Sequence, residues 1–147
     1  MFKPMLAKGV LPIMEEARFL VYRLGHCLID NEHYGMLSEM ETAKLAALEK
    51  SAVTLRESLD RIIELTESHF AHEEQVMDTE VYPYAEWHKT VHGFILKDLR
   101  ILGSKFITIG EKIYAERFFS DAMERLIIKH IDDTDRQLVE WISENKR

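Results

Sequence analysis

Apolar residues recur every three or four positions along most of the chain, and this spacing is typical of amphipathic α-helices. The first predicted helix begins near Asp30, whose side chain can cap the N–H groups at the start of residues 31–50. Further helices are predicted over residues 51–78, 84–106 and 111–131, and an amphipathic stretch, "DRQLVEWISEN", continues or follows the last of them. Pro83 separates the second helix from the third because proline disfavours helix before it. The pattern predicts an all-α, antiparallel, up-down-up-down four-helix bundle.

The first residues fit this pattern less clearly. The stretch "LPIMEEARFLVYRL" is compatible with a short extra helix, with Pro12 at its start and Gly25 past its end, or with an arm lying across the bundle. We therefore predict an N-terminal arm or extension over residues 1–24 and one bundle domain over residues 25–147. A chain of 147 residues is long enough to bury the core of a single domain.

Histidines stand in the apolar stripes where leucine or isoleucine is expected. Four of the seven histidines fall in the 24-residue stretch "HFAHEEQVMDTEVYPYAEWHKTVH". On the third helix, His88 and His92 are four positions apart and lead the stripe. The histidines predicted to face the interior are His33, His69, His88, His92 and His130.

Two carboxylates accompany these histidines. Glu73 follows His69 by four positions and therefore shares its face of the second helix. Asp135 follows His130 by five positions, which is about 140° around an ideal helix. For both of these side chains to face inward, the helix must end or deform there, or a loop must return the aspartate.

The composition argues against some classes of binding partner. The net charge of −7 and the pI near 5.5 argue against a nucleic acid or an anionic membrane surface, which attract clustered Lys and Arg. The single cysteine, Cys27, cannot form an internal disulfide. No apolar run approaches the length of a membrane span, and no signal peptide is evident. The expected location is the cytoplasm.

Buried imidazoles and carboxylates need partners, since an unmet buried polar group costs about 1–3 kcal/mol. A shared cation removes this cost because each group then donates a lone pair to metal. Seven ligands are too many for one tetrahedral zinc, whereas two metals that share bridging carboxylates fit the number. Nitrogen-rich ligation favours iron, copper, nickel or zinc over calcium and magnesium. The Glu-x-x-His motif of ferritin-like di-iron proteins and the His-Glu-x-x-His motif of zinc proteases are both absent.

Four segments together resemble the hemerythrin family, particularly its bacterial members. They are "GHCLIDNEH", "HFAHEEQVM", "YPYAEWHKTVH" and "HIDDTD", and they span roughly residues 25–142. The order His, HxxxE, HxxxH, HxxxxD with this spacing is highly specific. The resemblance implies a four-helix bundle that holds two irons, bridged by an oxo or hydroxo group and by two carboxylates.

The resemblance also implies how the ligands divide. One iron has three nitrogens and is six-coordinate and closed, whereas the other has two nitrogens and is five-coordinate and open to dioxygen. The implied ligands are His88, His92 and His130 for the closed iron, His33 and His69 for the open iron, and Glu73 and Asp135 as bridges.

Further residues on these faces are candidates for the wall of a dioxygen pocket, although ordinary core packing explains them equally well. His72 either packs near the site with one edge exposed, or stands behind the ligands as a hydrogen-bond donor or gate that makes binding pH-sensitive. The candidates are Leu65, His72, Trp87, Ile95, Met123 and Ile127.

The expected function is reversible dioxygen binding without catalysis, as an oxygen carrier, store or sensor. One alternative is a di-iron enzyme or repair protein that acts on nitric oxide or peroxide. Another is a sensory module of a larger signalling protein. The expected partner is dioxygen, with nitric oxide as a second gas, and a signalling domain or further copies of the chain remain open as protein partners.

Overall fold

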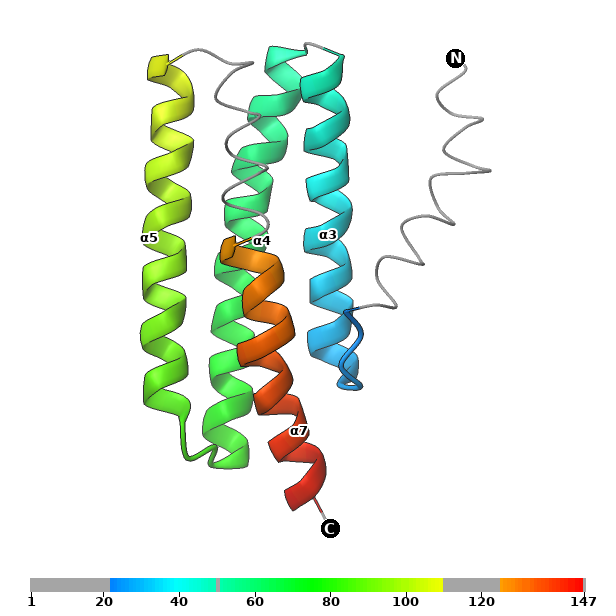
Figure 1. Ribbon diagram of the computed structural model, residues 1–147, viewed down its shortest axis with the longest axis vertical. Coiled ribbons are helices and arrows are strands. Elements are labelled where there is room, and N and C mark those ends of the chain that lie inside the picture. The colour runs from blue at the N-terminus through cyan, green and yellow to red at the C-terminus, as the bar shows by residue number, and fades with distance from the viewer. Residues whose placement is uncertain (1–21, 50, 110–124, 147) are drawn as a thin grey trace, which may run out of the picture.

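The computed structural model describes residues 22–49, 51–109 and 125–146, and these form antiparallel helices (Figure 1). Helices α3 (Cys27–Leu48), α4 (Ala52–Glu80) and α5 (Ala85–Ile109) run in alternating directions, and the chain returns through η2 (Ile131–Asp135) and α7 (Arg136–Asn145). The predicted all-α four-helix bundle is confirmed. The predicted N-terminal arm or extra helix falls almost entirely in residues 1–21, outside the described residues.

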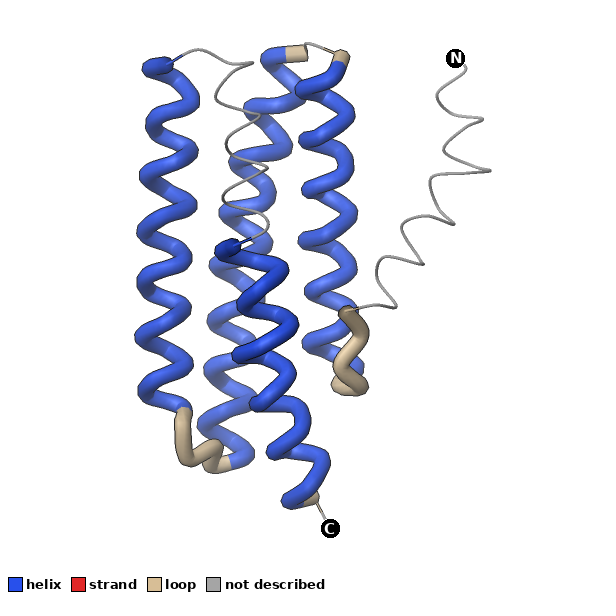
Figure 2. The backbone as a smooth tube through the Cα atoms, viewed as in Figure 1, coloured by secondary structure: helices blue, strands red, loops and turns tan. Residues whose placement is uncertain are grey.

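Short connections keep neighbouring helices antiparallel (Figure 2). Helix α4 is followed by Val81 in the left-handed conformation (φ 56°), and the Tyr82 N–H donates to the Met77 carbonyl, which closes the helix end. Pro83 lies in the turn, and α5 begins two residues later. This confirms the predicted break and places the histidines of α5 beside those of α4.

Helix α3 begins before the predicted start, so the prediction that Asp30 caps it from outside is wrong. The helix starts at Cys27, and the N-cap is His26, whose Nδ1 accepts from the Ile29 N–H at 3.4 Å. Asp30 lies inside the first turns and reaches back, where its two oxygens accept from the N–H groups of Leu24 (2.8 Å) and Gly25 (2.9 Å). A carboxylate in this position accepts hydrogen bonds from the backbone N–H groups that precede the helix, and its negative charge interacts favourably with the positive end of the helix dipole.

The fourth helix is described from Arg125 onward, so the first part of the predicted helix over residues 111–131 lies outside the described residues. Residues 131–135 wind as a π-helix, and α7 continues directly from it. Bonding from residue i to i+5 stacks Asp135 over His130, which a regular α-helix would hold about 140° apart. The predicted deformation between these two residues is confirmed.

Two apolar clusters fill the core, one on each side of a polar layer. The first contains Met40, Ile62 and Leu99, and the second contains Ile29, Met77 and Leu138. Each helix crosses both clusters, with its buried histidine or carboxylate between them; on α4, for example, Glu73 stands between Phe70 and Met77. Within the part of the chain described here, no helix is both long and apolar enough to span a bilayer.

Asp30 offers a test of how the entrance to α3 is held. The Asp30→Ala change removes the acceptor for two backbone N–H groups, and we expect it to lower the free energy of unfolding by about 1–2 kcal/mol. Urea unfolding followed by circular dichroism at matched metal content measures this loss. Glu64→Ala, at an exposed position of α4, is the control and should change the free energy little. Equal stability of the two variants would contradict the capping role of Asp30.

Candidate metal centre

The four helices bring all seven predicted ligands into one buried layer of the bundle. Helix α3 supplies one histidine, α4 a histidine and a glutamate, α5 two histidines, and the last helix a histidine and an aspartate. Each of these side chains is at most 5% exposed. Their ligand atoms form two sets, which share both carboxylates: Glu73, His88, His92, His130 and Asp135 in one, and His33, His69, Glu73 and Asp135 in the other.

We call His88, His92 and His130 the three-imidazole group. Their rings meet edge to face, with centroids 4.6 to 5.2 Å apart. We call His33 and His69 the two-imidazole group; their ring centroids are 4.6 Å apart. The two groups face each other across Glu73 and Asp135.

Each carboxylate divides its two oxygens between the groups. Asp135 places Oδ1 3.0 Å from His88 Nε2 and 2.9 Å from His130 Nε2, and it places Oδ2 3.0 Å from His33 Nε2. This is the arrangement of a carboxylate that bridges two metal ions.

Glu73 repeats this division from the opposite helix. Its Oε1 lies 2.9 Å from His88 Nε2 and 3.0 Å from His92 Nε2, whereas its Oε2 lies 3.3 Å from His69 Nε2. Each of the two carboxylates therefore directs one oxygen toward the three-imidazole group and its other oxygen toward the two-imidazole group.

The layer contains close contacts that hydrogen bonds do not explain. His33 Nε2 and His69 Nε2 are 3.1 Å apart, a distance at which their two lone pairs repel unless one nitrogen carries a proton. His130 Nε2 lies close to Asp135 and Glu73 Oε2 lies close to His69, but neither contact has the geometry of a hydrogen bond, so both atoms are buried without a hydrogen-bond partner among the described residues. Cations between these atoms would accept all of these lone pairs at once, so the residues present fit metal ions.

The carboxylates carry negative charge despite their burial. Burial and the charge of Asp135 would raise the pKa of Glu73, but its close contacts with His69, His88 and His92 lower it to about 2. Burial likewise opposes ionisation of Asp135, yet His130 and His33 hold its pKa well below the usual range. Burial would lower the pKa of His88, but Asp135 and Glu73 raise it to about 9. The interior therefore favours positive charge between the two carboxylates.

Two further glutamates, which sequence reasoning missed, stand behind the ligands. Glu32 Oε1 lies 3.0 Å from His69 Nδ1, and Glu74 Oε1 lies 2.9 Å from His92 Nδ1. Neither glutamate lies on an apolar stripe, so periodicity does not reveal them. The available signal was adjacency in the sequence, because Glu32 precedes His33 and Glu74 follows Glu73.

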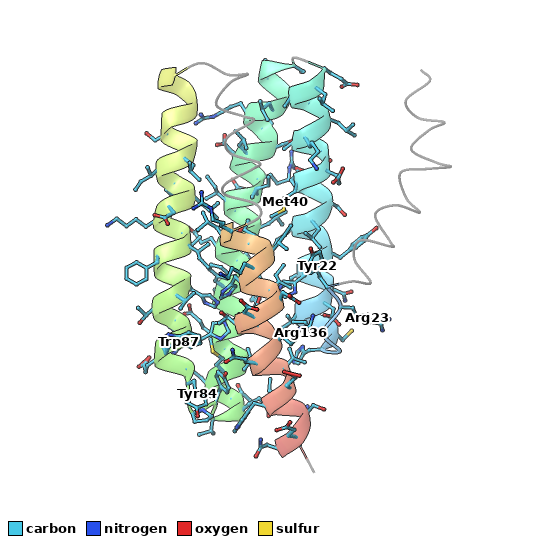
Figure 3. The ribbon with its side chains drawn as sticks, in the orientation of Figure 1. Tyr22, Arg23, Met40, Tyr84, Trp87 and Arg136 are labelled. Carbon is cyan, nitrogen blue, oxygen red and sulfur yellow. The ribbon has the colours of Figure 1, made fainter. Side chains whose placement is uncertain are left out.

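The residues predicted to line a dioxygen pocket differ in how deeply they are buried. Ile95 and Ile127 are buried, and Leu65 is partly buried, in the apolar cluster beside the ligands. Trp87 is 51% exposed near the lower end of α5 (Figure 3), with its ring roughly perpendicular to that of His88, so it departs from the predicted position in a pocket wall. Met123 lies outside the described residues.

The side chain of His72 is 45% exposed and contacts Glu32 rather than the buried layer, with Nδ1 2.5 Å from Glu32 Oε2. On the same helix, Phe70 points inward and is buried. Its ring stacks on that of His92, with centroids 3.7 Å apart and planes within 5°. Phe70 is absent from the predicted pocket residues, among which Leu65 and His72 are the candidates on this helix.

The family model of the hemerythrin HHE cation binding domain matches residues 26–142. A bacteriohemerythrin of Stenotrophomonas maltophilia (strain R551-3) is 26% identical over 119 residues, which cover 81% of this chain and 76% of that protein. Bacteriohemerythrins of Pseudomonas paraeruginosa (strain DSM 24068 / PA7) and Pseudomonas aeruginosa (strain LESB58) are each 25% identical, over 78% of this chain and 73% of theirs. No solved structure matches the chain.

The division of the Asp135 oxygens leads to a test of metal content. Asp135→Asn keeps the size of the side chain but replaces one carboxylate oxygen with an NH₂ group, which cannot bind metal. We expect two metal ions per chain in the unaltered protein and about one or fewer in the variant. Elemental analysis after loading with ferrous iron measures this number. Asp132→Asn, an exposed position in the same π-helical segment, should retain full loading, and equal loading of both variants would contradict a bridging role.

Proposed function

This chain belongs to the hemerythrin family, and we propose that it binds dioxygen reversibly at a pair of iron ions. The observation that carries the proposal is the division of the carboxylate oxygens. Glu73 and Asp135 each direct one oxygen to the three-imidazole group and the other oxygen to the two-imidazole group. Two ions held in this way share two bridges and remain close together in the dry interior of the bundle.

The two positions differ in the number of ligands. The three-imidazole group and the two carboxylates would give one iron five protein ligands, whereas the two-imidazole group and the same carboxylates would give the other only four. The iron held by His33 and His69 therefore has more room for an external ligand. When bound, ferrous iron supplies the electrons and the coordination position for dioxygen.

The surroundings favour a small apolar gas over an organic substrate. Leu37, Phe70, Ile95 and Ile127 belong to the apolar cluster on one side of the ligand layer, and Met77 and Leu138 belong to the cluster on the other side. These side chains exclude water from the two carboxylates, which strengthens their attraction for cations. Dioxygen is uncharged and small enough to pass between packed apolar side chains.

Among the relatives, the proteins of Stenotrophomonas and Pseudomonas are named bacteriohemerythrins. Their similarity extends over most of both chains and supports the proposal. The seven candidate ligand residues of this chain fall within the residues that the family model matches.

Dioxygen binding is tested by absorption spectroscopy. The protein is loaded with ferrous iron under argon, its visible spectrum is recorded, and air is admitted. We expect a new visible absorption from charge transfer to iron, which should disappear when the sample is returned to argon.

Protein loaded with zinc is the control, because zinc has no redox chemistry and should give no visible change. Irreversible oxidation of the iron without recovery under argon would contradict reversible binding. Sustained consumption of peroxide or nitric oxide with an electron donor would instead identify the chain as an enzyme.

A further inference from the structure

Glu32 lies between two imidazoles, one buried and one at the surface. It is on α3, one residue before His33, and its side chain is 20% exposed. Its Oε1 is 3.0 Å from Nδ1 of His69, and its Oε2 is 2.5 Å from Nδ1 of His72. Both oxygens of the carboxylate are therefore engaged, and they connect α3 to two successive turns of α4.

The contact with His69 bears directly on metal binding. His69 directs Nε2 toward the ligand layer, 3.1 Å from His33 Nε2. If Nε2 donates its lone pair to a metal, the proton of the neutral ring must stand on Nδ1, where Glu32 accepts it. A carboxylate behind a histidine ligand fixes both the tautomer and the orientation of the ring.

The contact with His72 fixes the carboxylate itself. A partly exposed glutamate can adopt several rotamers, and a second hydrogen bond selects the one that reaches His69. His72 also lines a surface cavity of about 320 Å³ together with His26, Gln75 and Glu80. The ring of His72 therefore borders this cavity on the surface while its Nδ1 is hydrogen-bonded to Glu32.

We propose that Glu32 is a positioning residue for the metal ligand His69, and that His72 holds Glu32 in the position this requires. The inference rests on the proposed two-metal centre and adds two residues to it, specifically on the side of the open position. It also gives a role to His72, a half-exposed histidine of α4 that is not among the proposed metal ligands.

The other metal position has its own carboxylate, which provides a matched control. Glu74 Oε1 lies 2.9 Å from Nδ1 of His92, which belongs to the three-imidazole group. Among the described residues, Glu74 is hydrogen-bonded to this one imidazole, whereas Glu32 is hydrogen-bonded to two. The Nδ1 atoms of His33, His88 and His130 have no hydrogen-bond partner among the described residues. Each metal position therefore has one ligand with a carboxylate behind it, and for the two-imidazole group that carboxylate is Glu32.

The experiment uses Co²⁺ as an air-stable probe whose visible absorption reports the coordination number. The full chain is stripped of metal and titrated with Co²⁺ in competition with a chelator, which separates a tighter step from a weaker one. The position with fewer ligands, at His33 and His69, is expected to be the weaker step. Glu32→Gln retains the size of the side chain but offers one acceptor oxygen in place of two.

We expect Glu32→Gln to weaken the weaker step by about 10- to 100-fold and to leave the tighter step unchanged. Glu74→Gln should do the reverse. His72→Ala should weaken the same step as Glu32→Gln, by a smaller factor, whereas His72→Gln should restore most of the affinity because its amide N–H can still donate to Glu32. Circular dichroism of the metal-free variants should show unchanged helicity.

The outcomes separate this proposal from the one on which it rests. If the unaltered chain binds fewer than two Co²⁺ ions, the two-metal centre is wrong and the positioning role falls with it. If it binds two and Glu32→Gln leaves both steps unchanged, the positioning role alone is wrong. Equal weakening of both steps together with lost helicity would show that Glu32 only supports the fold, and would also overturn the proposal.

Discussion

Burying two ionised carboxylates side by side costs free energy unless positive charge lies between them. Glu73 and Asp135 stand in this position, each fully enclosed and each ringed by imidazoles. Hydrogen bonds to Asp135 and Glu73 raise the pKa of His88 to about 9, so a proton on this imidazole supplies part of that charge in the absence of metal. A pair of metal ions supplies it more completely, because each ion accepts several lone pairs that otherwise oppose one another.

The rest of the bundle follows from holding this layer in place. Apolar clusters lie on both sides of the ligand layer and exclude water from it. The short turn after Val81 brings the histidines of α5 against those of α4, and the π-helical segment turns Asp135 to the same side as His130. Each of these local features is costly or uncommon in itself, and each serves to direct a ligand inward.

Much of this arrangement could be predicted from the sequence. The spacing of apolar residues gave the four helices, and the histidines were recognised because they stand where leucine is expected. The expectation that the helix deforms between His130 and Asp135 followed from angular geometry alone. These predictions succeeded because burial imposes a strict period on a helix and because a buried histidine without a partner is costly.

The remaining features depend on geometry that periodicity does not resolve. The predicted pocket residues on α4 are Leu65 and His72, whereas the structure turns Thr66 and Phe70 inward, because a helix of 29 residues drifts from any whole-number repeat. Asp30 was expected to start α3, but it reaches back to donors before the helix. Glu32 and Glu74 could not be found from the stripes, since they approach the ligands from the flank of each helix.

The central claim is that two carboxylates hold two metal ions next to each other inside this bundle. X-ray absorption at the iron edge of the iron-loaded protein tests it most directly, because the fine structure reports the neighbours of each iron. The account predicts nitrogen and oxygen neighbours and a second iron at about 3–4 Å, the spacing of bridged two-metal sites. Iron neighbours limited to nitrogen and oxygen, with no second iron within that range, would contradict it.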